Sequence, residues 1–342
     1  MPHPSELRLG TRGSQLALWQ AEAVAARITA AGGAPCRIVV IKTSGDRLQD
    51  APLAEVGGKR LFVKEIEDAL LQHTIDLAVH SSKDMPARLP DGLVIGGVLP
   101  RDDPRDAVVL PVLPVRLKAD PTIGGLKADA TVATIDDLVR RLGQSPSIGT
   151  GSVRRIAQLS RVFAGARFAA IRGNLDTRLR KLDAGAHDAL VLAAAGLRRL
   201  GFGARISFAL PVAACVPAPG QGIVAVEVRE DDDEVRQLVN RIADPSAAAA
   251  LAAERALVDA LGGGCQTPIG ALAAAIAPDR IELVAIVAAL DGSRVVRGSQ
   301  CGSQHDAASI GTQLGAKLMA DGAADILAEV RGTQGAVQGI QP

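Results

Sequence analysis

Arginines stand beside small polar residues (serine, threonine or asparagine) at three points of the sequence. These are Thr11-Arg12-Gly13-Ser14, Thr150-Gly151-Ser152-Val153-Arg154-Arg155 and Arg172-Gly173-Asn174, and each follows an apolar segment and begins a helical pattern. Exposed backbone N–H groups at such a junction, combined with positive charge, form anion sites. One junction alone would more often be an ordinary helix cap, made here by Ser14, Ser152 or Asn174. Three junctions that carry arginine favour a pocket for a polyanion.

A carboxylate and a thiol accompany these cations. Asp84 lies in His80-Ser81-Ser82-Lys83-Asp84-Met85-Pro86, at the end of another apolar strand. Beside Lys83 it would ordinarily be a surface ion pair, but in a crevice rich in arginine it is a candidate for proton transfer or for holding a cationic intermediate. Cys265 follows three glycines, which allow unusual loop dihedrals and expose the thiol. Spacing alone leaves open a tight turn with an incidental cysteine.

Positive charge is concentrated in one stretch of a nearly neutral chain. The 342 residues carry a net charge of +1, and 30 of the 38 basic residues are arginine. From residue 154 to residue 199, nine arginines and one lysine face three aspartates, a net charge of +7. For Arg161, Arg167 and Arg180 we favour a solvated helix face. Aromatic residues make up only 2%, which argues against nucleic-acid binding by base stacking.

Short apolar strands alternate with helical patterns through the first two-thirds of the chain. The expected strands are Leu7–Thr11, Arg37–Thr43, Ile75–His80, Leu93–Leu99, Ala107–Leu110, Phe168–Ile171, Ala189–Leu192 and Ile223–Val228. Helices are expected from Ser14 to Gly32 and over Val63–Gln72. This alternation predicts an α/β protein with parallel or mixed sheets and helices on both faces. In such sheets the strand-to-helix loops gather around the ligand crevice.

The last third of the chain has a different pattern. The acidic run Glu230–Glu234 begins a helix, and a long alanine-rich helix follows Pro245. A hairpin over Ile281–Leu290 and Arg294–Gly298 then precedes two terminal helices, which together indicate a small α+β domain. Pro111–Pro146 is rich in proline, glycine and charge, and we expect an irregular surface insertion there.

The composition favours a cytoplasmic protein. We expect neither a secretory signal, because no apolar run follows a basic start, nor a membrane span, because charges interrupt the apolar stretches. The four cysteines, Cys36, Cys215, Cys265 and Cys301, form no CxxC pair. The sequence therefore predicts no metal site and no disulfide framework.

Taken together, the motifs closely resemble the porphobilinogen deaminase family, also called hydroxymethylbilane synthases. The resemblance runs from Leu7 to Glu329 and is carried by LRLGTRGSQLALWQA, GGKRLFVKEIE, DLAVHSSKDMP, DDPRDA, GTGSVRR, IRGNLDTRL, AAAGLRRLG, PAPGQG and GGGCQTPIG. It implies two domains of the type II periplasmic-binding-protein fold, residues 1–104 with 220–242 and residues 105–219. A small third domain would comprise residues 243–342. The active site is expected in the cleft between the first two domains of a monomer.

The resemblance implies a transferase of tetrapyrrole (haem and chlorophyll) biosynthesis. Four porphobilinogen molecules would be condensed head to tail, with loss of ammonia, into hydroxymethylbilane. The primer would be a dipyrromethane cofactor held by a thioether to Cys265. Asp84 matches the catalytic carboxylate, which handles protons and stabilises the cationic azafulvene formed when ammonia leaves.

The other matching positions concern binding. Residues that match positions for carboxylates of the cofactor and substrate, or that support them, are Arg12, Ser14, Ser81, Lys83, Thr150, Ser152, Arg154, Arg155, Arg172, Arg178, Arg199 and Gln221. Each pyrrole bears an acetate and a propionate, so this polycarboxylate ligand agrees with the arginine-bearing junctions. Lys59 and Phe62 match the end of a mobile loop over the active site, with Lys42–Gly58 as the lid.

Two other classes of protein were weighed against this enzyme. A non-enzymatic binding protein for small polyanions would explain the arginine junctions, but it gives no role to Asp84 or to Gly262–Cys265. A nucleic-acid-binding protein would use the +7 stretch, and it would show steep salt dependence and stacking aromatic residues. The enzyme accounts for more of the sequence than either alternative.

The thioether gives the first prediction. Denatured, freshly purified chain should retain the extra mass of two pyrrole units on the peptide that contains Cys265, because a covalent bond survives unfolding. Mass spectrometry of the intact and the digested chain measures this, with the peptides of the other three cysteines as unmodified controls. An active enzyme whose Cys265 peptide is unmodified would contradict the attachment.

Overall fold

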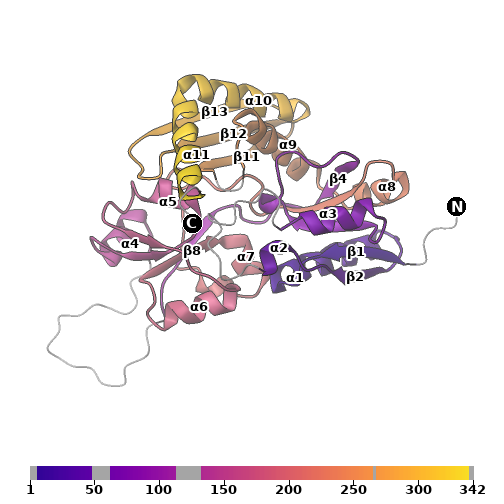
Figure 1. Cartoon of the computed structure of the whole chain (residues 1–342), viewed down its shortest axis with the longest axis horizontal. Helices are drawn as coiled ribbons and strands as arrows, with labels where there is room; N and C mark the ends of the chain where they lie inside the picture. The colour runs from indigo at the N-terminus through magenta and orange to yellow at the C-terminus, as the bar shows by residue number, and fades with distance from the viewer. Residues whose placement is uncertain (1–5, 48–61, 113–131, 265–266, 339–342) are drawn as a thin grey trace.

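Three sheets organise the chain. The structure is a computed structural model that describes residues 6–47, 62–112, 132–264 and 267–338. The described strands form two five-stranded mixed sheets and one three-stranded antiparallel sheet. Figure 1 shows the three groups of elements around a common centre, with the C-terminal group at the top.

The first sheet has the strand order β2-β1-β3-β10-β4. Its strands are β1 (Leu7–Thr11), β2 (Cys36–Val40), β3 (Leu77–Ser81), β4 (Leu93–Val98) and β10 (Val224–Arg229). Its helices are α1 (Gln15–Ala30), α2 (Ser44–Arg47), α3 (Lys64–Leu71), the single turn η1 (Ser82–Asp84) and α8 (Asp233–Arg241). β1 is parallel to β2 and β3, whereas β10 is antiparallel to β3 and β4.

Alternating side chains of this sheet pack against helices on opposite faces. Leu77 and Val79 of β3 share a core with Val24 of α1 and Val239 of α8. Ala78, between them, packs with α3 in a second core. Because successive residues of a strand point to opposite faces, α1 and α8 cover one face and α3 covers the other.

The second sheet has the order β7-β6-β8-β5-β9. Its strands are β5 (Asp106–Val109), β6 (Ser147–Gly149), β7 (Arg167–Ala169), β8 (Ala189–Ala193) and β9 (Phe208–Ala209). Its helices are α4 (Ile135–Leu142), α5 (Val153–Leu159), α6 (Leu175–Asp183), α7 (Ala194–Arg199) and the turn η2 (Gly203–Arg205). Separate cores join α4 and α5 to one face and α6 and α7 to the other.

The third sheet is an antiparallel meander. It consists of β11 (Ile269–Ala277), β12 (Arg280–Ala288) and β13 (Val295–Ser303). Its helices are α9 (Pro245–Ala260), η3 (Gln304–Asp306), α10 (Ala307–Leu318), η4 (Met319–Ala323) and α11 (Ala324–Gln338). Gly311 allows α10 to approach α9 closely, because a Cβ there would lie 2.1 Å from the Ala253 carbonyl oxygen.

Two crossover segments join the first two sheets and lie side by side. Residues 99–105 leave β4 for β5, and residues 210–223 return to β10. The Asp102 amide donates to Gly222 O at 3.1 Å, and Gln221 Nε2 donates to Pro104 O at 2.7 Å. Gly222 has φ +88°, and a Cβ there would lie 2.5 Å from Asp102 O. Glycine is therefore required for the two segments to pair.

Glu254 of α9 attaches the third sheet to the crossovers. Its buried Oε1 accepts from Arg101 Nη1 at 2.6 Å and from the Ala273 amide at 2.8 Å, and Oε2 accepts from the Gly220 amide at 2.6 Å. Arg101 Nε in turn donates to Gln221 O at 2.9 Å. One carboxylate therefore bonds both crossovers and β11 to α9.

Most of the expected elements are confirmed. The strand at Leu7–Thr11, the helix capped by Ser14 and the hairpin around Asp291-Gly292 are as predicted. The strand expected over Arg37–Thr43 ends at Val40 instead. Thr43 bonds to Asp46 through its backbone and its hydroxyl, which begins α2 in place of further strand pairing.

The prediction for Pro111–Pro146 was wrong in part. Residues 135–142 form α4, with a capping box between Thr134 and Asp137 and a fully buried Leu138. The capping box and the burial of Leu138 stabilise this helix, although the surrounding stretch is rich in proline and glycine, which disfavour helices. Residues 113–131 lie outside the described residues. β6 and β11 were also missed, because three residues show no periodicity and β11 is largely alanine, which favours strands weakly.

No helix in the described part of the chain has the length and apolar character needed to cross a lipid bilayer.

The Glu254 contacts predict a large effect of a small substitution. Glu254→Gln should lower the free energy of unfolding by about 3–5 kcal/mol, because it leaves the nearly buried Arg101 without its charge partner. Denaturant unfolding measures this. The control is Arg88→Ala, which removes the exposed Arg88–Asp259 pair of the same helix and should change stability little. Equal effects of the two substitutions would contradict the role of Glu254.

Candidate functional site

The three groups of elements meet at a cavity of about 90 Å³. Its lining includes Lys83 from the turn after β3, Ser152 and Arg154 from the start of α5, Pro219 from the returning crossover, Arg255 from α9 and Gly264. A larger hollow of about 470 Å³ lies between α1 and the segments at α6 and α7. None of the predicted site residues lines this hollow, so the smaller cavity is the candidate site.

The turn that carries Lys83 and Asp84 is fixed from two sides. Gln20 of α1 donates from Nε2 to Ser81 Oγ at 2.8 Å, and the Ser82 amide donates to Ile223 O at 3.0 Å. Gly220 packs directly on Ser82, since a Cβ there would lie 2.6 Å from Ser82 Oγ. The position of this turn therefore depends on α1 and on the returning crossover.

The surroundings of Lys83 disfavour its charged form. Burial lowers the pKa of its ammonium group to about 8; the negative charges of Asp84 and Asp106 oppose this shift, and the positive charges of Arg155 and Arg154 add to it. An anion bound in the cavity would restore the charged form, because an opposite charge favours it.

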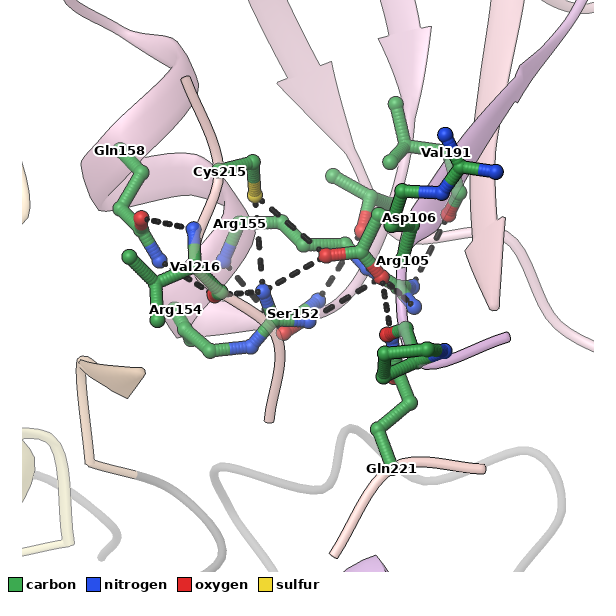
Figure 2. A network of polar contacts seen from close by, with 12 residues as sticks. Arg105, Asp106, Ser152, Arg154, Arg155, Gln158, Val191, Cys215, Val216 and Gln221 are labelled. Atoms are coloured by element: carbon green, nitrogen blue, oxygen red, sulfur yellow. Dashed lines mark hydrogen bonds and ion pairs between the residues drawn. The ribbon is translucent and has the colours of Figure 1, made fainter. Parts of the chain in front are cut away.

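A buried network of two arginines and one aspartate lies at the start of α5 (Figure 2). Arg154 Nη1 donates to Asp106 Oδ2 at 2.7 Å, and Arg155 donates to Asp106 Oδ1 from Nε at 2.9 Å and from Nη2 at 2.8 Å. Burial by itself raises the pKa of Asp106, but the charges and hydrogen bonds of Arg154 and Arg155 hold it well below its usual range. One carboxylate is thus shared by two guanidinium groups, which leaves an excess of positive charge.

Two buried polar atoms next to this network make no hydrogen bond to a described residue. They are Ser82 Oγ and Gln221 Oε1. Buried polar groups normally have partners, so such atoms indicate an interaction that the described residues do not supply. Excess positive charge together with these atoms fits a ligand that combines carboxylates with hydrogen-bonding groups, as a dipyrromethane does.

Further arginines extend the positive charge to α6. Burial lowers the pKa of the Arg178 guanidinium, and the neighbouring charges of Arg155 and Arg172 lower it further. Arg178 Nε donates to Gly173 O at 2.8 Å. The arrangement brings together arginines from two of the predicted junctions, and their mutual repulsion would be relieved by an anion.

The other two predicted ligand arginines have partners within the chain. Arg12 Nη2 pairs with Asp46 Oδ1 at 2.5 Å, and its guanidinium lies 4.3 Å from the Phe62 ring centre. Arg199 Nη2 donates to Gly222 O at 2.5 Å, and its guanidinium lies 5.5 Å from the Trp19 ring centre. A carboxylate that binds Arg12 must therefore compete with Asp46.

The hydroxyl residues of the junctions cap helices. Ser14 accepts from the Ala17 amide at 3.2 Å, and Ser152 accepts from the Arg155 amide at 3.5 Å. Asn174 caps α6 in the same way, and Thr150 Oγ1 accepts from the Ser152 amide at 3.3 Å. The capping expectation is confirmed. Arg161, Arg167 and Arg180 are all exposed, as expected, but only Arg180 lies on a helix: Arg161 is in the turn after α5, and Arg167 begins the strand β7.

Some predicted residues cannot be placed. Cys265, Lys59 and residues 48–58 of the predicted lid lie outside the described residues. Gly264 and Thr267, on either side of Cys265 and Gln266, both line the cavity.

Asp46, Asp106 and Arg255 were not predicted from the sequence. Asp106 belongs to the motif DDPRDA. A carboxylate directly before an apolar strand was the sequence feature that could have identified it. Arg255 donates to the Pro86 and Ala87 carbonyl oxygens at 2.8 and 2.7 Å, which attaches α9 to the segment that follows Asp84.

Two family models match the chain. Porphobilinogen deaminase, dipyromethane cofactor binding domain, matches residues 7–237, and the C-terminal domain of porphobilinogen deaminase matches residues 248–320. The chain belongs to the porphobilinogen deaminase family. It condenses porphobilinogen to hydroxymethylbilane in tetrapyrrole biosynthesis and uses a dipyrromethane cofactor. Membership decides against the polyanion-binding and nucleic-acid-binding alternatives.

Curated relatives match over nearly the whole length. The porphobilinogen deaminase of Syntrophobacter fumaroxidans is 44% identical over 325 residues, which is 95% of this chain and 97% of that protein. The one from Moorella thermoacetica is 43% identical over 335 residues, 98% of this chain and 99% of that protein.

Similar solved structures are more distant. The VFT2 domain of Bordetella pertussis BvgS is 15% identical with a TM-score of 0.37, covering 70% of this chain and 86% of that one. The periplasmic aliphatic sulphonate binding protein SsuA of Escherichia coli is 13% identical with a TM-score of 0.36, covering 75% and 70%.

The lowered pKa of Lys83 predicts a pH dependence of this deaminase. In the cofactor-free chain, Lys83 loses its proton as pH rises through about 8, and with it its attraction for a cofactor carboxylate, so the rate at which that chain gains the cofactor mass from porphobilinogen should fall. The matched variant is Lys83→Arg, which stays charged to much higher pH and should show a flatter rate profile between pH 7 and 9. Titration of the substrate affects both proteins equally. Identical profiles would contradict the prediction.

Proposed function

We propose that the buried cations at the cavity bind the carboxylates of the cofactor and substrate, and that Asp84 is the catalytic carboxylate. The observation that carries this proposal is the net positive charge of Lys83 and Arg154, which line the cavity, and of Arg155, which shares the Asp106 carboxylate with Arg154. A pocket of this kind selects a polycarboxylate.

The dipyrromethane would be held by residues from all three groups. Lys83, Arg154 and Arg155 supply the charge, and the unpartnered Ser82 Oγ and Gln221 Oε1 supply hydrogen-bonding atoms. The thioether would form at Cys265, and the nearby Gly264 and Thr267 border the cavity. When bound, the cofactor supplies the free pyrrole carbon to which the first substrate is joined.

The substrate's carboxylates would be bound by the arginines beyond this cluster. Arg172 and Arg178 lie close enough to Arg155 for their charges to interact. Arg12 would exchange Asp46 for a substrate carboxylate, and the flat face of Phe62 keeps its guanidinium oriented during the exchange. Arg199, which bonds to the crossover at Gly222, would complete this set.

Asp84 would act on the charge that develops in the substrate. Ammonia leaves the aminomethyl carbon of porphobilinogen, which leaves a positive charge spread over that carbon and the pyrrole ring. A carboxylate placed beside it lowers the energy of this cation. Each new carbon–carbon bond also releases a proton from the attacked pyrrole carbon, and Asp84 is the group proposed to accept it.

The division into domains is part of the proposal. Residues 1–104 with 220–242, residues 105–219 and residues 243–342 would form three domains, with the paired crossovers as the hinge between the first two. The return of β10 to the first sheet supports this division.

We also propose a monomer that acts in the cytoplasm, in keeping with the free thiols of Cys36, Cys215 and Cys301. Sedimentation analysis tests the monomer.

Replacement of Asp84 tests its assigned role. Asp84→Ala should lower kcat by about 10²–10⁴-fold, because general acid–base and charge stabilisation are lost, while the cofactor mass on the chain stays largely unchanged. Single-turnover assays and intact mass measure the two quantities. The control is Asp91→Ala, which removes an exposed aspartate that lies, like Asp84, between β3 and β4. Wild-type rates in Asp84→Ala would reject the role.

A further inference from the structure

We propose that Asp106 is the positioning residue of this site: it sets the orientation of Arg154 and Arg155 and couples that orientation to the crossovers. The inference rests on the proposed carboxylate-binding role of the two arginines. Asp106 itself lines no part of the cavity and acts through them.

The contacts of Asp106 fix the orientation of its carboxylate as well as pairing its charge. It is fully buried at the first position of β5, and its two oxygens accept from Arg154 and Arg155 at 2.7–3.3 Å. The Cys215 thiol, whose pKa burial raises to about 12, also donates to Oδ2 at 3.3 Å. A carboxylate with donors on both oxygens cannot rotate without breaking several of these bonds.

Each arginine has a second anchor on a different segment. Arg154 Nη1 donates to Val216 O at 2.8 Å, and Arg155 Nη1 donates to Val191 O at 2.9 Å (Figure 2). With Asp106 as the shared partner, each guanidinium is held at two points. Arg154 Nε makes no hydrogen bond to any residue within the described ranges, so it remains available to a ligand.

The charge balance argues against a purely structural cluster. Two buried guanidinium groups with one carboxylate remain net positive, and burial of an unmatched charge is costly. Buried ion pairs also contribute little to stability compared with apolar residues of the same volume. A cluster that served stability alone would be neutral or apolar. Because one carboxylate neutralises only one of the two guanidinium groups, positive charge remains for a ligand, and Asp106 sets the orientation of the groups that carry it.

Gln221 connects this carboxylate to the hinge. Its Nε2 donates to Asp106 Oδ1 at 3.0 Å and to Pro104 O at 2.7 Å, so Gln221, itself in the returning crossover, links Asp106 to the outgoing crossover as well. Gln221 O accepts from Arg101, which pairs with Glu254 of α9. A continuous chain of polar contacts therefore runs from the arginine pair to the helix that precedes the Cys265 loop.

The test compares Asp106→Asn with a control of matched instability. Asp106→Asn keeps the side-chain shape but turns an N–H group toward the arginines. We expect the fraction of purified chain that carries the cofactor mass to fall, or KM for porphobilinogen to rise, by about tenfold or more. Val108→Ala, in the same strand and also buried, should lower the thermal midpoint without either change. Full loading with KM within about twofold of wild type would overturn the proposal, as would equal changes in both variants.

A second variant keeps the proposal testable if Asp106→Asn does not fold. Asp106→Glu preserves the charge and shifts it by one methylene, so a folded protein should still show lower cofactor loading or a higher KM. Unchanged values of both would overturn the positioning role. Arg154→Gln and Arg155→Gln are measured in parallel. If neither alters loading or KM, the carboxylate-binding role of the arginines fails. If they do and the Asp106 variants do not, only the present inference fails.

Discussion

One carboxylate shared by two buried arginines is the interaction on which the site depends. Asp106 opens β5 in the second sheet, and Arg154 and Arg155 open α5 in the same group. Without Asp106, two guanidinium groups would be buried side by side with only backbone carbonyls and the Cys215 sulfur as partners among the described residues, an arrangement that electrostatic repulsion disfavours. With it, they hold a fixed orientation and still carry excess positive charge. This combination of order and charge supports the carboxylate-binding role proposed for the two arginines.

The same polar network explains why a three-part protein can hold one site. Gln221 bonds to Asp106 and to the outgoing crossover, Arg101 bonds to Gln221, and Glu254 bonds to Arg101 and to the Gly220 amide. These contacts are buried, so water does not weaken them as it weakens exposed pairs. Gly220 and Gly222 permit the close backbone approach that the network needs. In the motif PAPGQG, the glycines thus allow a close approach to neighbouring backbone, and Gln221 hydrogen-bonds to Asp106 and to the outgoing crossover.

Much of the fold could be predicted because its signals are local. Ser14, Ser152 and Asn174 cap helices as expected, since a cap needs only a hydroxyl or amide oxygen three residues before an amide. The errors have equally local causes: α4 lay inside a stretch of proline and glycine, and β6 is too short to show a period. For the site, the motifs identified Asp84 and the arginine junctions, and the turn of Lys83 does lie at the cavity with Arg154. The partners of those arginines were not predicted.

By itself, the sequence determined the family, the alternation of strands and helices and the residue types of a polyanion site, because ordered motifs and caps are properties of short segments. Only the tertiary structure decided which charges meet. Asp106 lies 48 residues before Arg154, and Asp46 lies 34 residues after Arg12. No spacing in the sequence encodes such pairs, since they form where strand ends from different parts of the chain come together. Burial, which shifts the pKa of Lys83 and leaves Ser82 Oγ without a partner, is likewise a property of the packed molecule alone.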